Sequence, residues 1–229
     1  MRFWGRLAIV ALTLAGPCTF ERAMAQSRLA PPLVFVILGP PGSGKTVQSR
    51  LLGKKYKIPV VAVSDLIKSE MGKHSRLADS LQIGVASGAL VNDDAANELI
   101  NARLLGSHTA RGFILDGYPL TESQARFFDD FLKKNSLPLP KVILLEVPDD
   151  LVKKRMTARR RVDDKPEIID ARIAQYRTDA QLLTKWYAQE NVLRVDASKS
   201  VPEVAAQIDR LIADSLTPKS FSNRELKQR

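Results

Sequence analysis

Cysteine, histidine and aromatic side chains are scarce in this sequence. Of 229 residues, one is cysteine, two are histidine, and aromatic residues make up 6%. The single cysteine, Cys18, lies in a segment that we expect to be removed, which would leave the mature chain without a thiol and exclude disulfides and cysteine-ligated zinc. The shortage of aromatics also argues against a single-stranded nucleic acid as ligand, because such ligands stack on aromatic rings.

Acidic residues are outnumbered by basic ones, and the net charge is +10. Residues 1–25 carry +2 and residues 217–229 carry +3, which leaves +5 for the middle of the chain. This excess fits a protein that binds small anions, and a basic face for nucleic acid is the competing interpretation. Of the two we favour small-molecule ligands and no nucleic acid. We also expect a monomer, with residues 217–229 forming a flexible basic tail.

No hydrophobic run is long enough to span a bilayer comfortably, and the run nearest the N-terminus is LAIVALTLAG. It follows the basic start MRFWGR and precedes the small residues Ala23 and Ala25, which is the pattern of a secretory signal peptide. We therefore expect residues 1–25 to be cleaved off and the mature protein to be exported or periplasmic, without membrane contact. The alternative is a start at Met24, which would give an intact cytoplasmic domain.

Five short apolar runs indicate buried strands, and the segments between them have helical patterns. Alternation of strands and helices predicts an α/β fold, a five-stranded parallel sheet with helices on both faces. Asn92 and Thr121 are placed to cap helices, and Pro166 is placed in the first turn of a long one. The runs are LVFVIL (33–38), VVAV (60–63), GFIL (112–115), KVILLEV (141–147) and NVLRV (191–195).

A phosphate-binding loop follows the first strand. Gly39, Gly44, Lys45 and Thr46 satisfy the pattern G-x-x-x-x-G-K-[ST] between a strand and a helix, which is the context that this motif requires. The glycines let backbone N–H groups surround a phosphate, and the lysine reaches the transferred group. Thr46 would ligate Mg²⁺ directly or through water, and Asp116, at the end of the run FIL, could organise the water shell of the metal.

Four motifs together resemble those of the adenylate kinase family. They are GPPGSGKTVQSRLLGKKYKIPVVAVSDLIK, SGALVND, GFILDGYPLTESQA and RVDDKPEIIDARIAQY, and the match runs from about Val34 to about Ile212. The resemblance implies a P-loop three-layer sandwich fold. It also implies an enzyme that reversibly transfers the γ-phosphoryl group of ATP to AMP with Mg²⁺. It also implies a domain over residues 33–216, with an acceptor-binding helical segment at about 64–93 and a minimal lid at about 156–166.

The resemblance assigns roles to individual residues. Arg155 would stack on the donor adenine, Arg159 would meet the donor phosphates, and Arg161 and Arg172 would close over both phosphate chains. Asp163 and Asp164 would orient these arginines. The implied catalytic residues are Lys45, Arg155, Arg161 and Arg172, and the implied ATP-binding residues are Gly42, Ser43, Gly44, Lys45, Thr46, Val47, Arg155, Arg159 and Lys199.

On the acceptor side the sequence departs from the family. Val63 replaces a hydroxyl that bonds the base, Lys68 replaces an arginine for the AMP phosphate, and Leu120 replaces a second such arginine, whereas Gln124 is retained beside the base. The alternatives are therefore a kinase for another phosphate acceptor, or an ATP-binding protein with weak or no transfer. The implied acceptor residues are Val63, Lys68, Ala89, Leu90, Val91, Gly117, Leu120, Gln124, Arg161 and Arg172.

Overall fold

The structure is a computed structural model that describes residues 31–73, 75–79, 81, 92–106, 109, 111–159 and 165–216. All of these except Pro31 belong to one compact unit, Pro32–Arg229. Among the described residues, no helix has both the length and the apolar character needed to cross a membrane.

Strands and helices alternate along the chain, as the sequence predicts. The five strands are β1 (Leu33–Leu38), β2 (Val60–Ala62), β3 (Gly112–Asp116), β4 (Lys141–Glu146) and β5 (Val192–Asp196). The helices are α2 (Lys45–Tyr56), α3 (Val63–Met71), α5 (Asp93–Leu105), α6 (Glu122–Lys134), α7 (Asp149–Arg159), α8 (Pro166–Trp186) and α9 (Val201–Leu216), with a 3-10 turn at Gln189–Asn191.

The strands form one parallel sheet in the order β2-β3-β1-β4-β5. The predicted five-stranded α/β fold is therefore confirmed. Gly112 lies where β3 approaches β1 most closely: its φ is +106°, and a Cβ atom there would stand 1.9 Å from the carbonyl oxygen of Leu33. Only glycine fits this position, because both the backbone angle and the space exclude a side chain.

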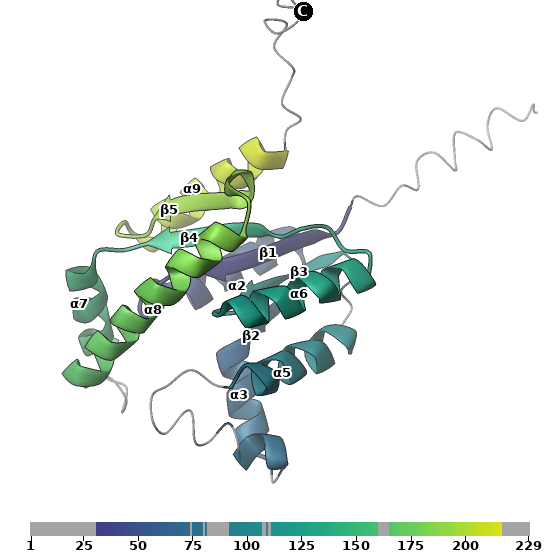
Figure 1. The fold of residues 1–229 in the computed structure, drawn as a ribbon. Helices are drawn as coiled ribbons and strands as arrows, with labels where there is room; N and C mark the ends of the chain where they lie inside the picture. The colour runs from purple at the N-terminus through teal and green to yellow at the C-terminus, as the bar shows by residue number, and fades with distance from the viewer. Residues whose placement is uncertain are drawn as a thin grey trace, which may run out of the picture. The chain divides into compact units, whose positions relative to one another are not determined.

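Helices cover both faces of the sheet, which explains why the central strand β1 is apolar throughout. Val34, Val36 and Leu38 of β1 point to the face covered by α5, α6 and α8, and the alternate residues Phe35 and Ile37 point to the face covered by α2 and α9. Figure 1 shows α6 and α8 in front of the sheet and α2 behind it.

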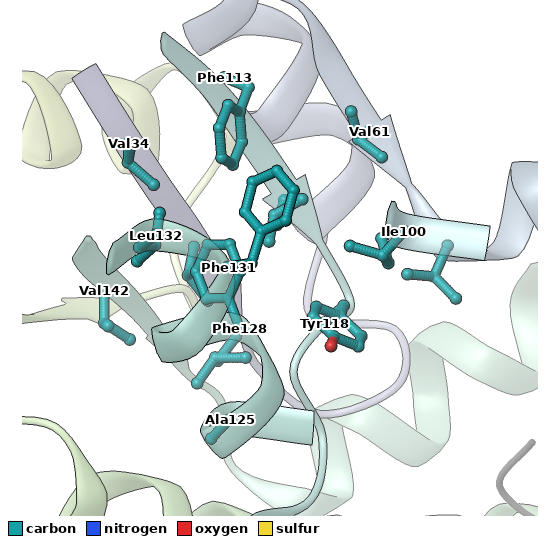
Figure 2. Packing of buried hydrophobic residues seen from close by; sticks show 14 of the residues in the cluster. Val34, Val61, Ile100, Phe113, Tyr118, Ala125, Phe128, Phe131, Leu132 and Val142 are labelled. Carbon is teal, nitrogen blue, oxygen red and sulfur yellow. The ribbon is translucent and has the colours of Figure 1, made fainter. Parts of the chain in front are cut away.

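The larger core cluster contains a group of aromatic rings between the sheet and α6 (Figure 2). The ring of Phe128 meets the edges of Phe113 and Tyr118, each at a centroid distance of 6.2 Å. All three residues are fully buried. Edge-to-face pairs of this kind add to the free energy gained by burial, so α6 is fixed firmly against β3.

Four of the five strands differ from the sequence prediction by one residue at one or both ends. The strand predicted over 112–115 extends to Asp116, and the one predicted over 141–147 ends at Glu146. The strand predicted over 60–63 ends at Ala62, and Val63 instead begins α3. The strand predicted over 191–195 runs one residue later, because Asn191 belongs to a 3-10 turn. Both helix caps and the early proline lie where predicted: Asn92 caps α5, Thr121 caps α6, and Pro166 is in the first turn of α8.

Candidate active site

A cavity of about 980 Å³ lies along the carboxyl ends of the parallel strands. Residues after β2 and β3 (Val63, Lys68 and Gln124) form one end, and residues after β4 and β5 (Arg155 and Lys199) form the other. The loop after β1, the central strand, lies between them. Ligands in such folds bind at this edge of the sheet. Here the sheet order places the phosphate loop between the two ends of the cavity, which we call its lobes.

The loop after β1 has the backbone that phosphate binding requires. Gly42 and Gly44 have φ values of +75° and +94°, in the left-handed region. Lys45, the first residue of α2, donates hydrogen bonds from Nζ to the carbonyl oxygens of Gly39 at 2.7 Å and Pro40 at 3.0 Å. The loop therefore curves around the lysine, with the N-terminus of α2 directed into the cavity.

Burial and neighbouring charges shift the ionisation of the central side chains. Burial lowers the pKa of Lys45 to about 8; the carboxylate of Asp116 counteracts this shift and the positive charge of Arg159 adds to it. Burial also raises the pKa of Asp116, and the hydrogen bond from Thr46 and the charge of Lys45 partly offset that rise. Perturbed groups that face one another in a cleft are typical of functional sites.

Thr46 and Asp116 provide a donor set that fits Mg²⁺. Oδ2 of Asp116 is buried and has no hydrogen-bond partner among the described residues, although Thr46 bonds the same carboxylate. Asp65, from the first turn of α3, also lines the cavity and acts electrostatically on Asp116. Hard oxygen ligands of this kind suit Mg²⁺, which retains several waters and binds through one or two carboxylates and substrate phosphates.

Within the described ranges, no cluster of three or more histidine, cysteine, aspartate or glutamate side chains could hold a metal ion.

At the β5 end of the cavity, Arg155 from α7 binds the loop that follows β5. Its guanidinium donates to the carbonyl oxygens of Ala197 at 2.8 Å and Ser198 at 3.3 Å. Gln48 of α2 holds the next part of the chain by donating to the carbonyl oxygen of Val201 at 3.1 Å. The backbone beside Lys199 is therefore fixed from two directions, which provides a rigid wall for a flat ligand.

Packing between α7 and α8 brings together arginines that are distant in the sequence. Val152 and Met156 of α7 form a small core with Ile169 and Ile173 of α8. As a result Arg155 and Arg159 of α7 and Arg172 of α8 all line the same cavity.

At the β2 end, Gln124 is held by a polar network under the cavity. Its Nε2 donates to Oδ1 of Asp93 at 2.7 Å, and its Oε1 accepts the backbone N–H of Leu120 at 2.7 Å. The hydroxyl of Tyr118 donates to Oδ1 of Asn97 at 2.6 Å and lies 3.2 Å from the carbonyl oxygen of Gln124. The amide is thus rigidly placed where it can meet a ligand.

Comparison with known proteins identifies the family. The family model described as adenylate kinase matches residues 37–192. Adenylate kinases of Brucella ovis and Brucella canis are each 35% identical over 189 residues, which cover 78% of this chain and 97% of those proteins. The chain belongs to the adenylate kinase family. It is accordingly a phosphotransferase that uses a phosphate group as acceptor, in the class of nucleoside monophosphate kinases.

A second cavity, of about 790 Å³, adjoins the first. It lies between the phosphate loop and α8 and is lined mainly by apolar side chains. Lys45, Leu120 and Arg172 line both cavities, so they mark the junction between them. The leucine therefore contributes an apolar surface beside two cationic groups, at the position where the family resemblance implies an arginine.

Several of the residues implied by the family resemblance line the first cavity, and others lie outside the described residues. Outside are Ala89, Leu90, Val91 and Arg161, together with the carboxylates Asp163 and Asp164. Their roles stay predictions. Those that line the cavity are Gly42, Ser43, Gly44, Lys45, Thr46, Val47, Val63, Lys68, Asp116, Gly117, Leu120, Gln124, Arg155, Arg159, Arg172 and Lys199.

Among the polar residues of the site that sequence reasoning missed, three are charged. Arg50 of α2 and Asp65 of α3 both line the cavity and lie 3.8 Å apart between Nη2 and Oδ2. The third is Asp93, the partner of Gln124. The position of Asp65, just after a strand at the ligand-binding edge, was a usable signal. Arg50 and Asp93 gave none, because their partners come from other elements.

Proposed function

We propose that this chain transfers the γ-phosphoryl group of ATP to AMP, reversibly and with Mg²⁺. The observation that supports this most is the position of the phosphate loop in the cavity. Lys45 and Thr46 lie between a lobe with Gln124 and a lobe with Arg155 and Lys199. A site for one nucleotide would need only one of these lobes, whereas direct transfer requires two nucleotides that meet at their phosphates.

The side chains contribute mainly by alignment and charge neutralisation, because phosphoryl transfer needs little covalent chemistry from the protein. Lys45 would bind the transferred group, and Arg159 and Arg172 would neutralise phosphate charge from α7 and α8. When bound at Thr46 and Asp116, directly or through water, Mg²⁺ would supply charge neutralisation at the β- and γ-phosphates. Gln124 would contact the acceptor base, and Arg155 would stack on the donor base.

Lys68 and Leu120 favour a second candidate, a kinase for a different phosphate acceptor. Losing one guanidinium contact to the acceptor phosphate removes about 1.5 to 3 kcal/mol, and so about ten- to a hundredfold in rate or affinity for AMP. Lysine at position 68 keeps the charge but not the planar fork of an arginine. Arg50 and Arg172 also line the cavity and supply further positive charge.

A coupled assay with ATP and each of AMP, CMP, UMP, GMP and dAMP tests the function. We expect AMP to have the highest kcat/KM, because Gln124 is retained. A strong preference for any other acceptor would instead support the second candidate. ATP binding measured by calorimetry without turnover of any monophosphate would support the third, a nucleotide-binding protein with little or no transfer.

We also propose that the protein is exported after cleavage behind Ala25 and that it is a monomer that binds small nucleotides and no nucleic acid. The signal-like N-terminus supports export, and the scarcity of aromatic side chains supports the expectation that no single-stranded nucleic acid binds. The N-terminal residue of the mature protein and the cell fraction that contains it test export: Gln26 in the periplasm is expected, and Met24 in the cytoplasm would contradict it. Light scattering after size exclusion tests the monomer.

A further inference from the structure

The amide group of Gln124 has a partner on each side. Nε2 donates to Oδ1 of Asp93, and Oε1 accepts from the N–H of Leu120, both at 2.7 Å. Gln124 is 3% exposed, and the exposed part lines the cavity. Gln124 therefore lines the cavity with its amide held in place by the protein itself.

These two partners allow one orientation of the amide. An ionised carboxylate only accepts hydrogen bonds, and a backbone N–H only donates. If the amide turned over, its oxygen would face the carboxylate of Asp93 and its NH₂ group would face the N–H of Leu120. Both bonds would be lost, and a buried polar group that loses its partner is costly.

Asp93 itself cannot shift easily to accommodate a turned amide. Its other oxygen, Oδ2, accepts a hydrogen bond from the hydroxyl of Thr121 at 2.9 Å. Asp93 is the first residue of α5, and Thr121 is the cap of α6. The carboxylate is thus fixed between two helices, and it orients Gln124 from an element other than its own.

The fixed amide has one N–H and one lone pair left for a ligand. A 6-aminopurine such as adenine has a donor at N6 beside an acceptor at N1, whereas a 6-oxopurine such as hypoxanthine or guanine has an acceptor at O6 beside a donor at N1. A free glutamine could turn over to match either edge. A fixed glutamine matches the edge of one purine. Against the other purine it places donor against donor and acceptor against acceptor.

We propose that Asp93 is a positioning residue that sets acceptor specificity: by fixing the amide of Gln124 it selects a 6-aminopurine monophosphate over a 6-oxopurine monophosphate. The choice of the 6-amino edge rests on the proposed function, in which AMP is the acceptor. Discrimination of this kind is strong, because a mismatched base leaves polar groups of the site unpaired.

The variant Asp93→Asn tests the proposal, because an asparagine can offer either an oxygen or an NH₂ group to Gln124. The N–H of Leu120 is then the one remaining partner that favours the original orientation of the amide. We expect the ratio of kcat/KM for AMP to kcat/KM for IMP to fall by at least about tenfold. The change should come mainly from a higher KM for AMP, with the KM for ATP unchanged.

Asp94→Asn is the matched control. It removes the same charge from the same first turn of α5, but Asp94 is exposed and does not line the cavity. We expect its AMP to IMP ratio to equal that of the wild type. If Asp93 acted only through the stability of α5, both substitutions would change the AMP to IMP ratio of kcat/KM equally. An unchanged ratio in Asp93→Asn would overturn the proposal.

Two further measurements cover the remaining outcomes. If the wild type turns over no AMP, the proposed function fails, and the ratio of the AMP and IMP dissociation constants from calorimetry then tests specificity by itself. If Asp93→Asn does not fold, NMR of the wild type decides: the side-chain NH₂ of Gln124 should contain one proton that is protected from solvent exchange. Rapid exchange of both protons would overturn the proposal.

Discussion

Leu120 places an uncharged side chain at the junction of the two cavities, beside Lys45 and Arg172. Its backbone is as important as its side chain, because the N–H of Leu120 holds Oε1 of Gln124. A substitution at this position therefore changes the side chain at the junction while leaving the hydrogen bond to the glutamine in place.

Leu120→Arg should increase kcat/KM for AMP. A guanidinium there can form charge-assisted bonds to the acceptor phosphate, and we expect an increase of about ten- to a hundredfold with little change in the KM for ATP. Steady-state kinetics with AMP varied at saturating ATP measures it. Leu120→Met, which alters shape without adding charge, is the control, and an unchanged rate in the arginine variant would refute this account of the acceptor site.

The pH dependence of ATP use should follow Lys45. Its pKa is lowered to about 8 by burial, so the ammonium group is lost as the pH rises through that value. Because the charged form binds phosphate, kcat/KM for ATP should fall about tenfold per pH unit above the pKa. In Lys45→Arg the guanidinium stays protonated, so kcat/KM for ATP should not fall over this pH range, however low its value is. A wild-type profile that is flat up to about pH 10 would contradict the assignment.

At the scale of elements, the sequence predicts best where the signal is local. The caps Asn92 and Thr121 and the early Pro166 lie where expected, since each acts on the next few backbone N–H groups or on its own φ. The start of α3 at Val63 gives no such signal. The helix follows β2 directly and has no side-chain cap, so apolar residues 60–63 give the appearance of a longer strand.

Asn92→Ala should weaken α5. The side chain accepts from the N–H of Asp94 at 2.8 Å and lies 3.4 Å from that of Ala95, so alanine leaves these donors without a partner. The free energy of unfolding should fall by about 1 kcal/mol, measured by urea denaturation. Asn92→Ser retains a capping oxygen, so its free energy of unfolding should be close to that of the wild type. Equal stability of the alanine variant and the wild type would show that the cap does not contribute.

Across the whole molecule, the alternation of apolar runs with helical segments was sufficient to predict a parallel sheet, because such a sheet has helices on both faces. The phosphate loop was also predictable, since its residues are contiguous. The rest of the site depends on contacts between distant segments. Gln124 and Asp93 are 31 residues apart, and Arg155 and Ala197 are 42 apart. No local pattern encodes such pairs, so only the fold brings them together.

Phe128→Ala should destabilise the whole domain. The ring is fully buried between the sheet and α6 and meets Phe113 and Tyr118 edge to face. Removing it should lower the free energy of unfolding by about 3 to 5 kcal/mol, through lost burial and a residual cavity. Thermal and urea unfolding measure this loss. Leu105→Ala, at a position 63% exposed, is the control and should change stability by less than about 0.5 kcal/mol. Similar losses in both variants would contradict this description of the core.

The hydrogen bonds from Lys45 to Gly39 and Pro40 affect how products leave. In a reversible reaction the loop must both bind ATP and release ADP. When a phosphate departs, the two carbonyl oxygens can receive the ammonium group at once, so the lysine is never left buried without a partner. The carbonyl oxygens of the loop thus take the place of the nucleotide phosphate as hydrogen-bond partners of Lys45. This exchange reduces the net affinity for the nucleotide and favours rapid turnover in both directions.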